Sequence, residues 1–311
     1  MKKIFYYLTI LLYLIILPVN AQVTDYEKLI GGNGEIYMSP VWSPDGSMIA
    51  FTSANYKGIY VLNLENRSVK QITDEDAAGF VINWSANSEY ILSRVARFEG
   101  LRRYNAIKIF NIKTGEEKQL SDYRTMMPGI PQWANGGKDV FVYNTEKLEL
   151  FPTGLTNSSK QTSDIIVYKR NGKIAVENLS TESLKIYEPV KDGEVLNLTI
   201  SPDGKKAAFE IIGGNMYVMN VDGTGLTNLG KGYRPSWSPD SKTIYYMITE
   251  DDGHQILSSD IYSINIDGSG KRNITNTEDI KEMNPEVSPD GKYIAFDILD
   301  EGAIYISKIQ D

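Results

Sequence analysis

The chain has 311 residues, a formal net charge of -8, one histidine and no cysteine. The lack of cysteine excludes a disulfide framework, a thiolate metal site and a cysteine nucleophile. The acidic balance gives no support to nucleic-acid binding.

The N-terminus is typical of an export signal. Lys2 and Lys3 precede an apolar run from Ile4 to Leu17, and small residues lie just before Gln22. We expect residues 1–21 to be a cleaved secretory signal and residues 22–311 to form one domain, which is periplasmic or secreted. The alternative is that the run is retained as a membrane anchor. After cleavage no membrane span is expected, and there is no cysteine for lipid attachment.

An internal repeat organises the rest of the sequence. The stretch VWSPDG at 41 recurs in altered form five times, and a large apolar residue fills the same slot each time. The later copies are NWSANS at 83, QWANGG at 132, TISPDG at 199, SWSPDS at 236 and EVSPDG at 286. All four tryptophans occupy this slot, and it is therefore predicted to be a core position: Trp42, Trp84, Trp133 and Trp237, with Ile200 and Val287 in the other two copies.

A second repeat follows each copy of the first. Alternating segments such as IYVLNL and MYVMNV are predicted strands, and all but one of the six place an asparagine in register. Turn residues and a short polar strand come next, most clearly after VDGTG at 221 and IDGSG at 266. The slot holds Asn63, Asn111, Asn178, Asn220 and Asn265, with Lys308 in the last copy.

Each repeat therefore predicts four antiparallel strands. Four-stranded units repeated every 40 to 50 residues indicate a β-propeller, and six copies predict six blades. In the SPDG turn, proline presets one backbone angle, aspartate accepts nearby N–H groups and glycine takes the last conformation. The aspartates are accordingly interpreted as turn-formers rather than catalytic groups. The expected fold is an all-β six-bladed propeller of four-stranded antiparallel blades.

The ends of the chain predict how the ring closes. The last repeat stops just after its third strand, at Asp311, while YEKLIGG at 26 places Ile30 twelve residues before Trp42. Ile72 lies at the same distance from Trp84. We expect the N-terminal strand to complete the last blade, which leaves no open edge between blades.

The motifs WSPDG, IAFTS, IYVLNL and the DGSG hairpins resemble the six-bladed TolB-type propeller. That family is related to the WD-type repeats and to the propeller of dipeptidyl peptidase four relatives. The resemblance covers essentially all of residues 22–311 and implies an envelope protein that binds another protein, such as a peptidoglycan-associated lipoprotein. TolB proteins carry a further α/β domain before the propeller, whereas only about 14 residues follow Gln22 before the first inner strand.

The repeats differ mainly between their second and third strands. The distance from the tryptophan slot to the asparagine slot is 21, 27, 45, 20, 28 and 21 residues in order. These connections emerge on one face of a propeller, and insertions gathered on one face often mark the binding face. The second repeat inserts SRVARFEGLRRYN, which holds four of the nine arginines. The third inserts residues 145–172, including PTGLTNSSKQTS, and the fifth inserts TEDDGHQILSSD.

Arginines beside aromatic residues suit recognition of carboxylate, phosphate or a protein surface, because the guanidinium group binds anions with two donors and stacks on rings. The alternative is a solvated hairpin whose arginines pair with local acids. The candidate binding residues are Arg94, Arg97, Arg102, Arg103, Tyr104, Arg124, Tyr233, Arg234 and His254.

No enzyme signature is evident. His254 is the only candidate base, no GxSxG elbow occurs, and a single histidine cannot build a metal cage. We therefore expect no catalytic residues, metal or cofactor, and a monomer that binds an envelope protein or a small ligand. The alternative function is a carbohydrate-active propeller that binds glycans or cleaves them with two carboxylates.

Overall fold

The computed structural model describes residues 26–155 and 164–309. The expected signal at residues 1–21 and most of the PTGLTNSSKQTS stretch lie outside these ranges. None of the helices in the described ranges has the length and apolar character needed to cross a membrane.

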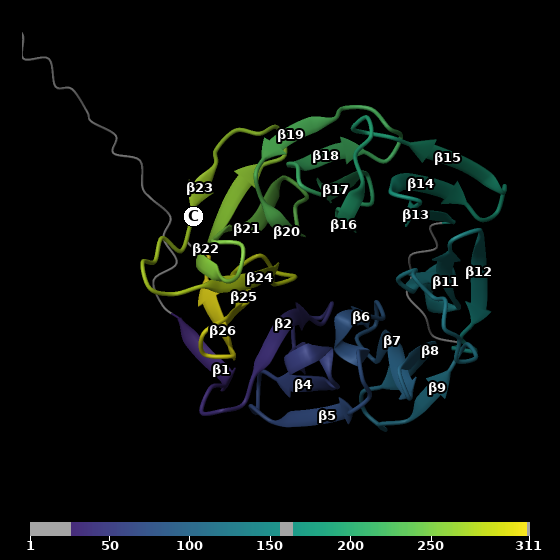
Figure 1. The fold of residues 1–311 in the computed structure, drawn as a ribbon, viewed down its shortest axis with the longest axis horizontal. Helices are drawn as coiled ribbons and strands as arrows, with labels where there is room; N and C mark the ends of the chain where they lie inside the picture. The colour runs from purple at the N-terminus through teal and green to yellow at the C-terminus, as the bar shows by residue number, and fades with distance from the viewer. Residues whose placement is uncertain (1–25, 156–163, 310–311) are drawn as a thin grey trace, which may run out of the picture.

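The described residues form seven antiparallel sheets arranged around a ring in chain order (Figure 1). The fold is an all-β propeller, but the prediction of six blades is wrong, because the third and longest repeat forms two sheets. Five sheets have four strands, and the third and fourth have three each among the described residues. We number them blades 1 to 7 from the sheet that follows β1.

The first four blades contain the following strands. Blade 1 has β2 (Tyr37–Trp42), β3 (Met48–Ser53), β4 (Ile59–Asn63) and β5 (Val69–Thr73). Blade 2 has β6 (Asn83–Trp84), β7 (Tyr90–Glu99), β8 (Arg102–Asn111) and β9 (Glu117–Gln119). Blade 3 has β10 (Gln132–Ala134), β11 (Asp139–Asn144) and β12 (Lys147–Pro152). Blade 4 has β13 (Ile165–Arg170), β14 (Lys173–Asn178) and β15 (Ser183–Tyr187).

The remaining strands complete the ring. Blade 5 has β16 (Val195–Ile200), β17 (Lys206–Ile211), β18 (Met216–Asn220) and β19 (Thr227–Gly230). Blade 6 has β20 (Tyr233–Trp237), β21 (Thr243–Asp251), β22 (Ile256–Asn265) and β23 (Arg272–Asn273). Blade 7 has β24 (Glu282–Val287), β25 (Tyr293–Ile298), β26 (Ala303–Lys308) and β1 (Glu27–Gly31). Three short 3-10 turns are η1 (Ala54–Tyr56), η2 (Ala78–Phe80) and η3 (Asn135–Gly137).

The closure of the ring agrees with the sequence expectation. β1 pairs antiparallel with β26, and Glu27 lies opposite Ile306. The N-terminal strand thus becomes the outer strand of blade 7, and hydrogen bonds between the two ends of the chain hold the ring shut.

The SPDG turns share one hydrogen-bond pattern. In blade 1 the Ser43 hydroxyl donates to Asp45 Oδ1 at 2.7 Å and accepts from the Met48 amide at 3.0 Å. Gly46 follows with φ +73°. Serines at the same place in four other blades donate to the aspartate or asparagine two residues later, at 2.6 to 2.7 Å: Ser85, Ser201, Ser238 and Ser288.

The repeated asparagine begins the hairpin between the third and fourth strands. In blade 1 the Asn63 amide donates to the Ser68 carbonyl at 2.9 Å, and the Asn63 side chain accepts from the amides of Glu65 and Asn66. The side chain therefore holds the turn while the backbone pairs with the outer strand. Amides of three equivalent residues make the same kind of backbone bond: Asn111, Asn220 and Asn265.

Pro152 is one reason why the third sequence repeat looks like a single unit although it forms two blades. Asp139 at the start of β11 pairs with Pro152, just as Met48 at the start of β3 pairs with Asn63, so Pro152 occupies the asparagine slot of blade 3. It lies 19 residues after Trp133, a normal distance for one blade. Proline has no amide to begin the hairpin. The next residue that fills the asparagine slot, Asn178, belongs to blade 4.

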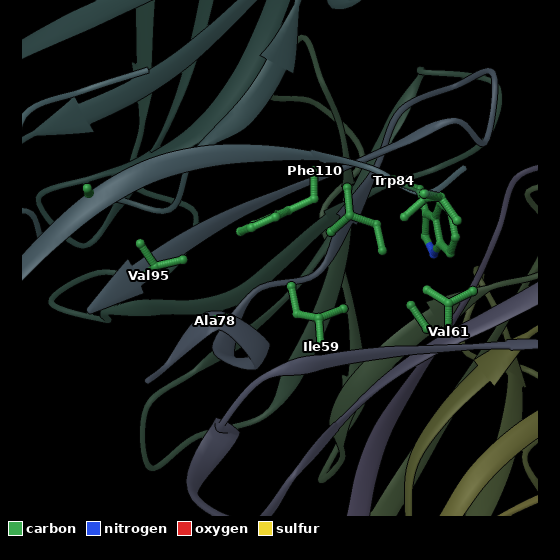
Figure 2. Close-up of a cluster of buried hydrophobic side chains, with 10 residues drawn as sticks. Ile59, Val61, Ala78, Trp84, Val95 and Phe110 are labelled. Carbon is green, nitrogen blue, oxygen red and sulfur yellow. The ribbon is translucent and has the colours of Figure 1, made fainter. Parts of the chain in front are cut away.

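Apolar clusters between neighbouring blades form the core. Between blades 1 and 2, Ile59 and Val61 of β4 face Trp84, Val95 and Phe110 of blade 2 (Figure 2). The repeated tryptophans also join neighbouring inner strands, since Trp42, Trp84 and Trp133 each donate from Nε1 to a carbonyl of the preceding blade, at 3.1 to 3.2 Å. The prediction of a core position holds for Trp42, Trp84, Trp237 and Val287, which are buried, while Trp133 and Ile200 are partly buried and pack against their clusters.

The fifth residue of every second strand contacts the next blade. Asp297 accepts from the Ser39 amide at 2.8 Å, Glu210 accepts from the Arg234 amide at 2.6 Å, and Lys169 forms an ion pair with Glu194 at 2.9 Å. We call this set the ring position, and its seven members are Thr52, Arg94, Tyr143, Lys169, Glu210, Met247 and Asp297.

The other four members use different chemistry for the same contact. The Thr52 side chain packs so closely on Gly79 that no Cβ would fit there. The Tyr143 hydroxyl lies 3.4 Å from Asn171 Oδ1, and the Met247 sulfur lies 3.5 Å from the Asn284 amide. Arg94 is described below. The ring position therefore fixes how the blades approach one another on one side of the propeller.

Candidate functional site

The propeller has two unlike faces. The SPDG turns and the hairpins that follow the asparagine slot lie on one, which we call the SPDG face. The hairpins between second and third strands and the links between blades lie on the other, which we call the insertion face. Because strand direction alternates within each blade, the insertions of the second and fifth repeats, in the β7–β8 and β21–β22 hairpins, emerge on the insertion face. The expected insertion of the third repeat is instead part of two blades, since it contains β12 and β13.

Exposed apolar side chains gather on the insertion face. Sixteen large hydrophobic residues are exposed among the described residues, and ten of them lie in its links, in its hairpins or at the strand ends beside them. Single exposed apolar residues are ordinary, but a concentration on one face is typical of an interaction surface. The ten are Ile36, Phe80, Phe98, Leu101, Met126, Ile130, Leu196, Ile212, Leu257 and Leu299.

The hairpin of β7 and β8 is the longest feature of this face. Its ten residue pairs run continuously from Tyr90 opposite Asn111 to Glu99 opposite Arg102. The base packs in the core, while the tip carries Leu101, which is fully exposed, and Phe98, whose exposed fraction is 56%. The sequence prediction of an inserted arginine-rich hairpin is therefore confirmed in its position.

Among the arginines near the hairpin tip, Arg97 contacts both aromatic rings and a carboxylate. Its guanidinium lies 4.4 Å from the centre of the Tyr123 ring and 5.7 Å from that of Tyr104. It also forms an ion pair with Glu99 at 3.2 Å. Arg103 donates from Nε to Asn105 at 2.9 Å, and Arg102 is exposed at the tip. The hairpin thus presents cations beside aromatic rings, as the sequence predicted.

An ion network centred on the buried Lys108 supports the aromatic platform beneath Arg97, which consists of the Tyr104 and Tyr123 rings. Lys108 Nζ lies 2.9 Å from both Glu75 and Glu117, and the Tyr123 hydroxyl donates to Glu75 at 3.0 Å. Burial acts to lower the pKa of Lys108, but the hydrogen bonds that it donates to Glu117 and Glu75 outweigh it and the pKa is raised. Burial and the nearby Glu75 raise the pKa of Tyr123. The Lys108 ammonium beneath the Tyr123 ring therefore stays charged at neutral pH.

Arg94 does not lie on the open surface. It is buried at the ring position, and its Nη1 donates to the carbonyls of Met127, Pro128 and Gly129 at 2.8, 3.1 and 2.9 Å. Burial and the charge of Arg103 lower its pKa. Its guanidinium therefore holds the link into blade 3, which is a structural role that the sequence interpretation missed.

The other predicted residues are distributed around the ring. Arg124 donates to both carboxylate oxygens of Glu149 at 3.0 and 2.9 Å, which lowers the pKa of Glu149, and its backbone pairs with Asn105 beside the hairpin. Tyr233 and Arg234 begin the inner strand of blade 6, and His254 is exposed at the tip of the β21–β22 hairpin. Blade 6 is separated from blade 2 by blades 7 and 1, so the structure does not join these three to the arginine hairpin.

Two buried carboxylates were not predicted from the sequence. Glu210 and Asp297 occupy the ring position, and each binds an asparagine of its own blade as well as an amide of the next blade. Burial raises the pKa of Asp297 to about 7. Glu286, on the inner strand of blade 7, also has its pKa raised to about 7 by burial. Blade 6 separates Asp297 from Glu210, so they act as separate inter-blade contacts.

Within residues 26–155 and 164–309, no group of three or more histidine, cysteine, aspartate or glutamate residues is placed to hold a metal ion. In the acidic stretch TDEDAAG at 73, Glu75 accepts instead from Lys108 and Tyr123. In TEDDG at 249, Asp252 accepts from the amides of His254 and Gln255 at 2.9 Å each.

Solved structures similar to this chain are propellers. TolB from Acinetobacter baumannii matches with a TM-score of 0.52 and 18% identity, over 76% of this chain and 53% of that one. Putative TolB from Agrobacterium tumefaciens matches at 0.52 and 15%, over 89% and 91%. The propeller domain of Cps50 (Swd1) from Myceliophteria thermophila matches at 0.66 and 10%, over 92% and 100%.

These similarities show the fold alone. The chain spans about half the length of the Acinetobacter TolB chain. No protein-family profile and no curated protein matches the sequence. The resemblance to TolB is therefore supported as a structural likeness between propellers.

Proposed function

We propose that the protein is a non-catalytic interaction module of the cell envelope that binds a partner protein through its insertion face. The main observation behind this proposal is that exposed apolar side chains concentrate on that face. They lie next to the arginine-rich β7–β8 hairpin, in which Arg97 faces aromatic rings. Aromatic residues, methionine and arginine are the residue types enriched at protein interfaces. The TolB-like fold and the export signal expected at residues 1–21 support the envelope location.

The hairpin supplies two complementary elements. Phe98 and Leu101 offer apolar area at the tip, and Arg97, Arg102 and Arg103 offer cations in an otherwise acidic protein. Carboxylate groups on a partner would meet these cations, so we expect an acidic partner surface with an apolar centre.

The test is site-specific crosslinking in native envelope extract, with a photoreactive residue at Leu101 and, separately, at Lys242 on the opposite face. A defined protein crosslinked only from Leu101 supports the proposal. Changing Arg97, Arg102 and Arg103 to glutamate should abolish this crosslink. The matched control changes Lys205, Lys242 and Lys292 to glutamate, which makes the same net charge change on the SPDG face, where each lysine pairs only with its own turn.

Equal crosslinking from both faces, or equal loss in both triple variants, would contradict the proposal. In that case screening of the insertion face against glycans becomes the next experiment, because it tests the carbohydrate-active alternative.

A further inference from the structure

We propose that Arg94 and Arg103 form an anion-binding site on the insertion face, which accepts a carboxylate carried beside an apolar group. The site lies on the side of the β7–β8 hairpin that faces blade 3. It deepens the function proposed above and rests on it, because it names the chemical group that a partner presents to this hairpin.

Strand pairing brings the two arginines to the same side of the hairpin. Arg94 lies opposite Ile107, and Phe98 lies opposite Arg103. Residues opposite one another share a side, and so do residues two or four positions apart along a strand. Arg94, Phe98 and Arg103 therefore share one side, which faces blade 3 because Arg94 binds the link into that blade. The charge of Arg103 is close enough to lower the pKa of Arg94.

Neither arginine has a carboxylate partner among the described residues. In those ranges the arginines that form ion pairs are Arg67, Arg97 and Arg124. Arg97 and its partner Glu99 point to the opposite side of the hairpin, because side chains alternate along β7. Residues 156–163 contain no acid. A buried charge is ordinarily paired with an opposite charge, so two neighbouring cations without an acid indicate a place for an anion.

Part of the Arg94 guanidinium is left without acceptors. Its Nη1 donates to the three carbonyls of the link into blade 3, and these bonds hold the group in place. Its Nε is buried and has no acceptor in the part of the chain that the structure describes, where Nη2 makes no hydrogen bond either. Nε and Nη2 form one edge of the guanidinium, and such an edge binds a carboxylate through two parallel hydrogen bonds. Because Nη1 is engaged and Nε is shielded, an anion approaches this edge through Nη2.

Arg124 shows the bonding that Arg94 lacks. Its two terminal nitrogens bind the two carboxylate oxygens of Glu149 at 3.0 and 2.9 Å. Its guanidinium also lies 5.9 Å from the centre of the Phe151 ring. Arginine, carboxylate and aromatic ring thus meet in one contact of this molecule. The Arg94 site has the arginine and the ring, and the described residues supply it with no carboxylate.

Two exposed phenylalanines flank the arginines. The Arg94 guanidinium carbon lies 5.5 Å from the centre of the Phe80 ring, and Phe98 lies directly opposite Arg103. The exposed fractions of Phe80 and Phe98 are 46% and 56%. A ligand can therefore bury an apolar group on these rings while its charge meets the arginines. This favours a carboxylate next to an apolar side chain over a bare inorganic anion.

The test is a titration of the full chain labelled with nitrogen-15 arginine, in which NMR follows the Nε–H signals. One probe is acetyl-Gly-Gly-Leu with a free C-terminal carboxylate. The other is acetyl-Gly-Leu-Glu-Leu-Gly with an amidated C-terminus, whose single carboxylate is on the glutamate side chain. We expect a saturable shift of the Arg94 and Arg103 signals with at least one of them. The first peptide identifies a chain end as the ligand, and the second identifies an acidic residue within a chain.

Two ligand controls separate charge from apolar contact. The amide of the first peptide keeps the leucine but has no charge, and it should not shift the Arg94 signal. Inorganic phosphate has charge but no apolar group, and it should bind roughly fivefold more weakly than the better peptide, or weaker still.

Variants at the exposed Arg103 test the site without disturbing the bonds of Arg94. Arg103→Gln should weaken peptide binding by roughly fivefold or more, and Arg103→Lys, which keeps the charge, should retain more of the affinity. The matched control is Arg170→Gln, which removes the same charge from another arginine of the insertion face that lies over a ring, at 4.8 Å from the centre of Tyr143. It should change the affinity less than about twofold. Thermal unfolding checks that the variants are folded.

Four results would overturn the proposal: no shift of Arg94 with either peptide, equal binding of the uncharged amide, tighter binding of phosphate, or equal loss of affinity in the Arg103→Gln and Arg170→Gln variants. Crosslinking from Leu101 is a separate measurement. Peptide binding without a crosslinked envelope protein would contradict only the proposed function, whereas a crosslinked protein without peptide binding would contradict only this site.

Discussion

The SPDG face and the insertion face belong to the same seven sheets, but different kinds of contact stabilise them. On the SPDG face, five serines make the same hydrogen bond to an aspartate or asparagine two residues later. On the insertion face, the ring position makes its contact with threonine, arginine, tyrosine, lysine, glutamate, methionine and aspartate in turn. Local bonds thus stabilise one face uniformly, while the other depends on individual contacts between blades and is free to vary.

The largest expected effect is at Arg94. Replacement by methionine leaves the carbonyls of Met127, Pro128 and Gly129 without their donor, and we expect the free energy of unfolding to fall by about 3 kcal/mol. Urea unfolding measures this. The matched control is Arg67→Met on the SPDG face, where the exposed pair with Glu27 contributes less than about 0.5 kcal/mol. Equal losses would mean that the two faces do not differ in this way.

The next effect depends on pH. Burial raises the folded-state pKa of Asp297 to about 7 from its usual value near 4, so the folded state holds a proton that the unfolded state has lost. This contribution to stability is present below pH 4 and is lost as pH rises through 7. Glu286 acts in the same direction and window.

We therefore expect the free energy of unfolding to fall between pH 5 and 8. Asp297→Asn should reduce this fall by on the order of 2 kcal/mol, since asparagine keeps the acceptor that Ser39 and Asn284 use and cannot ionise. Denaturant titrations at several pH values test this, with Asp290→Asn in an SPDG turn as the control. An unchanged pH slope in the Asp297 variant would show that its carboxyl does not titrate in this window.

A smaller and uniform effect is expected on the SPDG face. Changing the turn serine to alanine removes one hydroxyl donor and one acceptor in every case, so each variant should lose about 1 to 2 kcal/mol. The four variants Ser43→Ala, Ser201→Ala, Ser238→Ala and Ser288→Ala should agree to within about 0.5 kcal/mol by urea unfolding. A wide spread would argue against a common local role.

The smallest effect on stability is expected at the hairpin tip. Phe98→Ser and Leu101→Ser remove exposed apolar groups, so the free energy of unfolding should change by less than about 0.5 kcal/mol. Binding of the partner should nevertheless be lost, which a pull-down from envelope extract measures. A loss of stability above 1 kcal/mol would show that the tip packs against the protein itself, which thermal unfolding detects directly.

Most of this fold could be predicted from the sequence, because each repeated motif has a local physical cause. The tryptophan slot bridges inner strands, and the asparagine slot begins a hairpin, so both recur wherever those contacts form. The blade count was wrong because Pro152 stands where an asparagine was expected and because no copy of the tryptophan stretch occurs between 132 and 199, where blade 4 lies. The span of 45 residues from Trp133 to Asn178 was the available signal, since it exceeds every other distance between the two slots.

The candidate site was predicted in part. The arginine hairpin was located from its length and composition, and Arg97, Tyr104 and their neighbours lie together there. Arg94 was assigned to the binding face because it lies in the inserted stretch SRVARFEGLRRYN, but it is the buried fifth residue of β7 and binds the link into the next blade. Asp297 and Glu210 were not predicted because the ring position carries a different residue type in every blade, so the sequence shows no repeat at that position.

The pairing of β1 with β26 also fixes how the molecule responds to force. Glu27 lies opposite Ile306, so the two ends of the described chain meet at the same end of one strand pair. Tension between the termini would part the rungs of this pair one after another, rather than shearing them together. We therefore expect the seam between β1 and β26 to part before the other sheets of the ring are pulled apart.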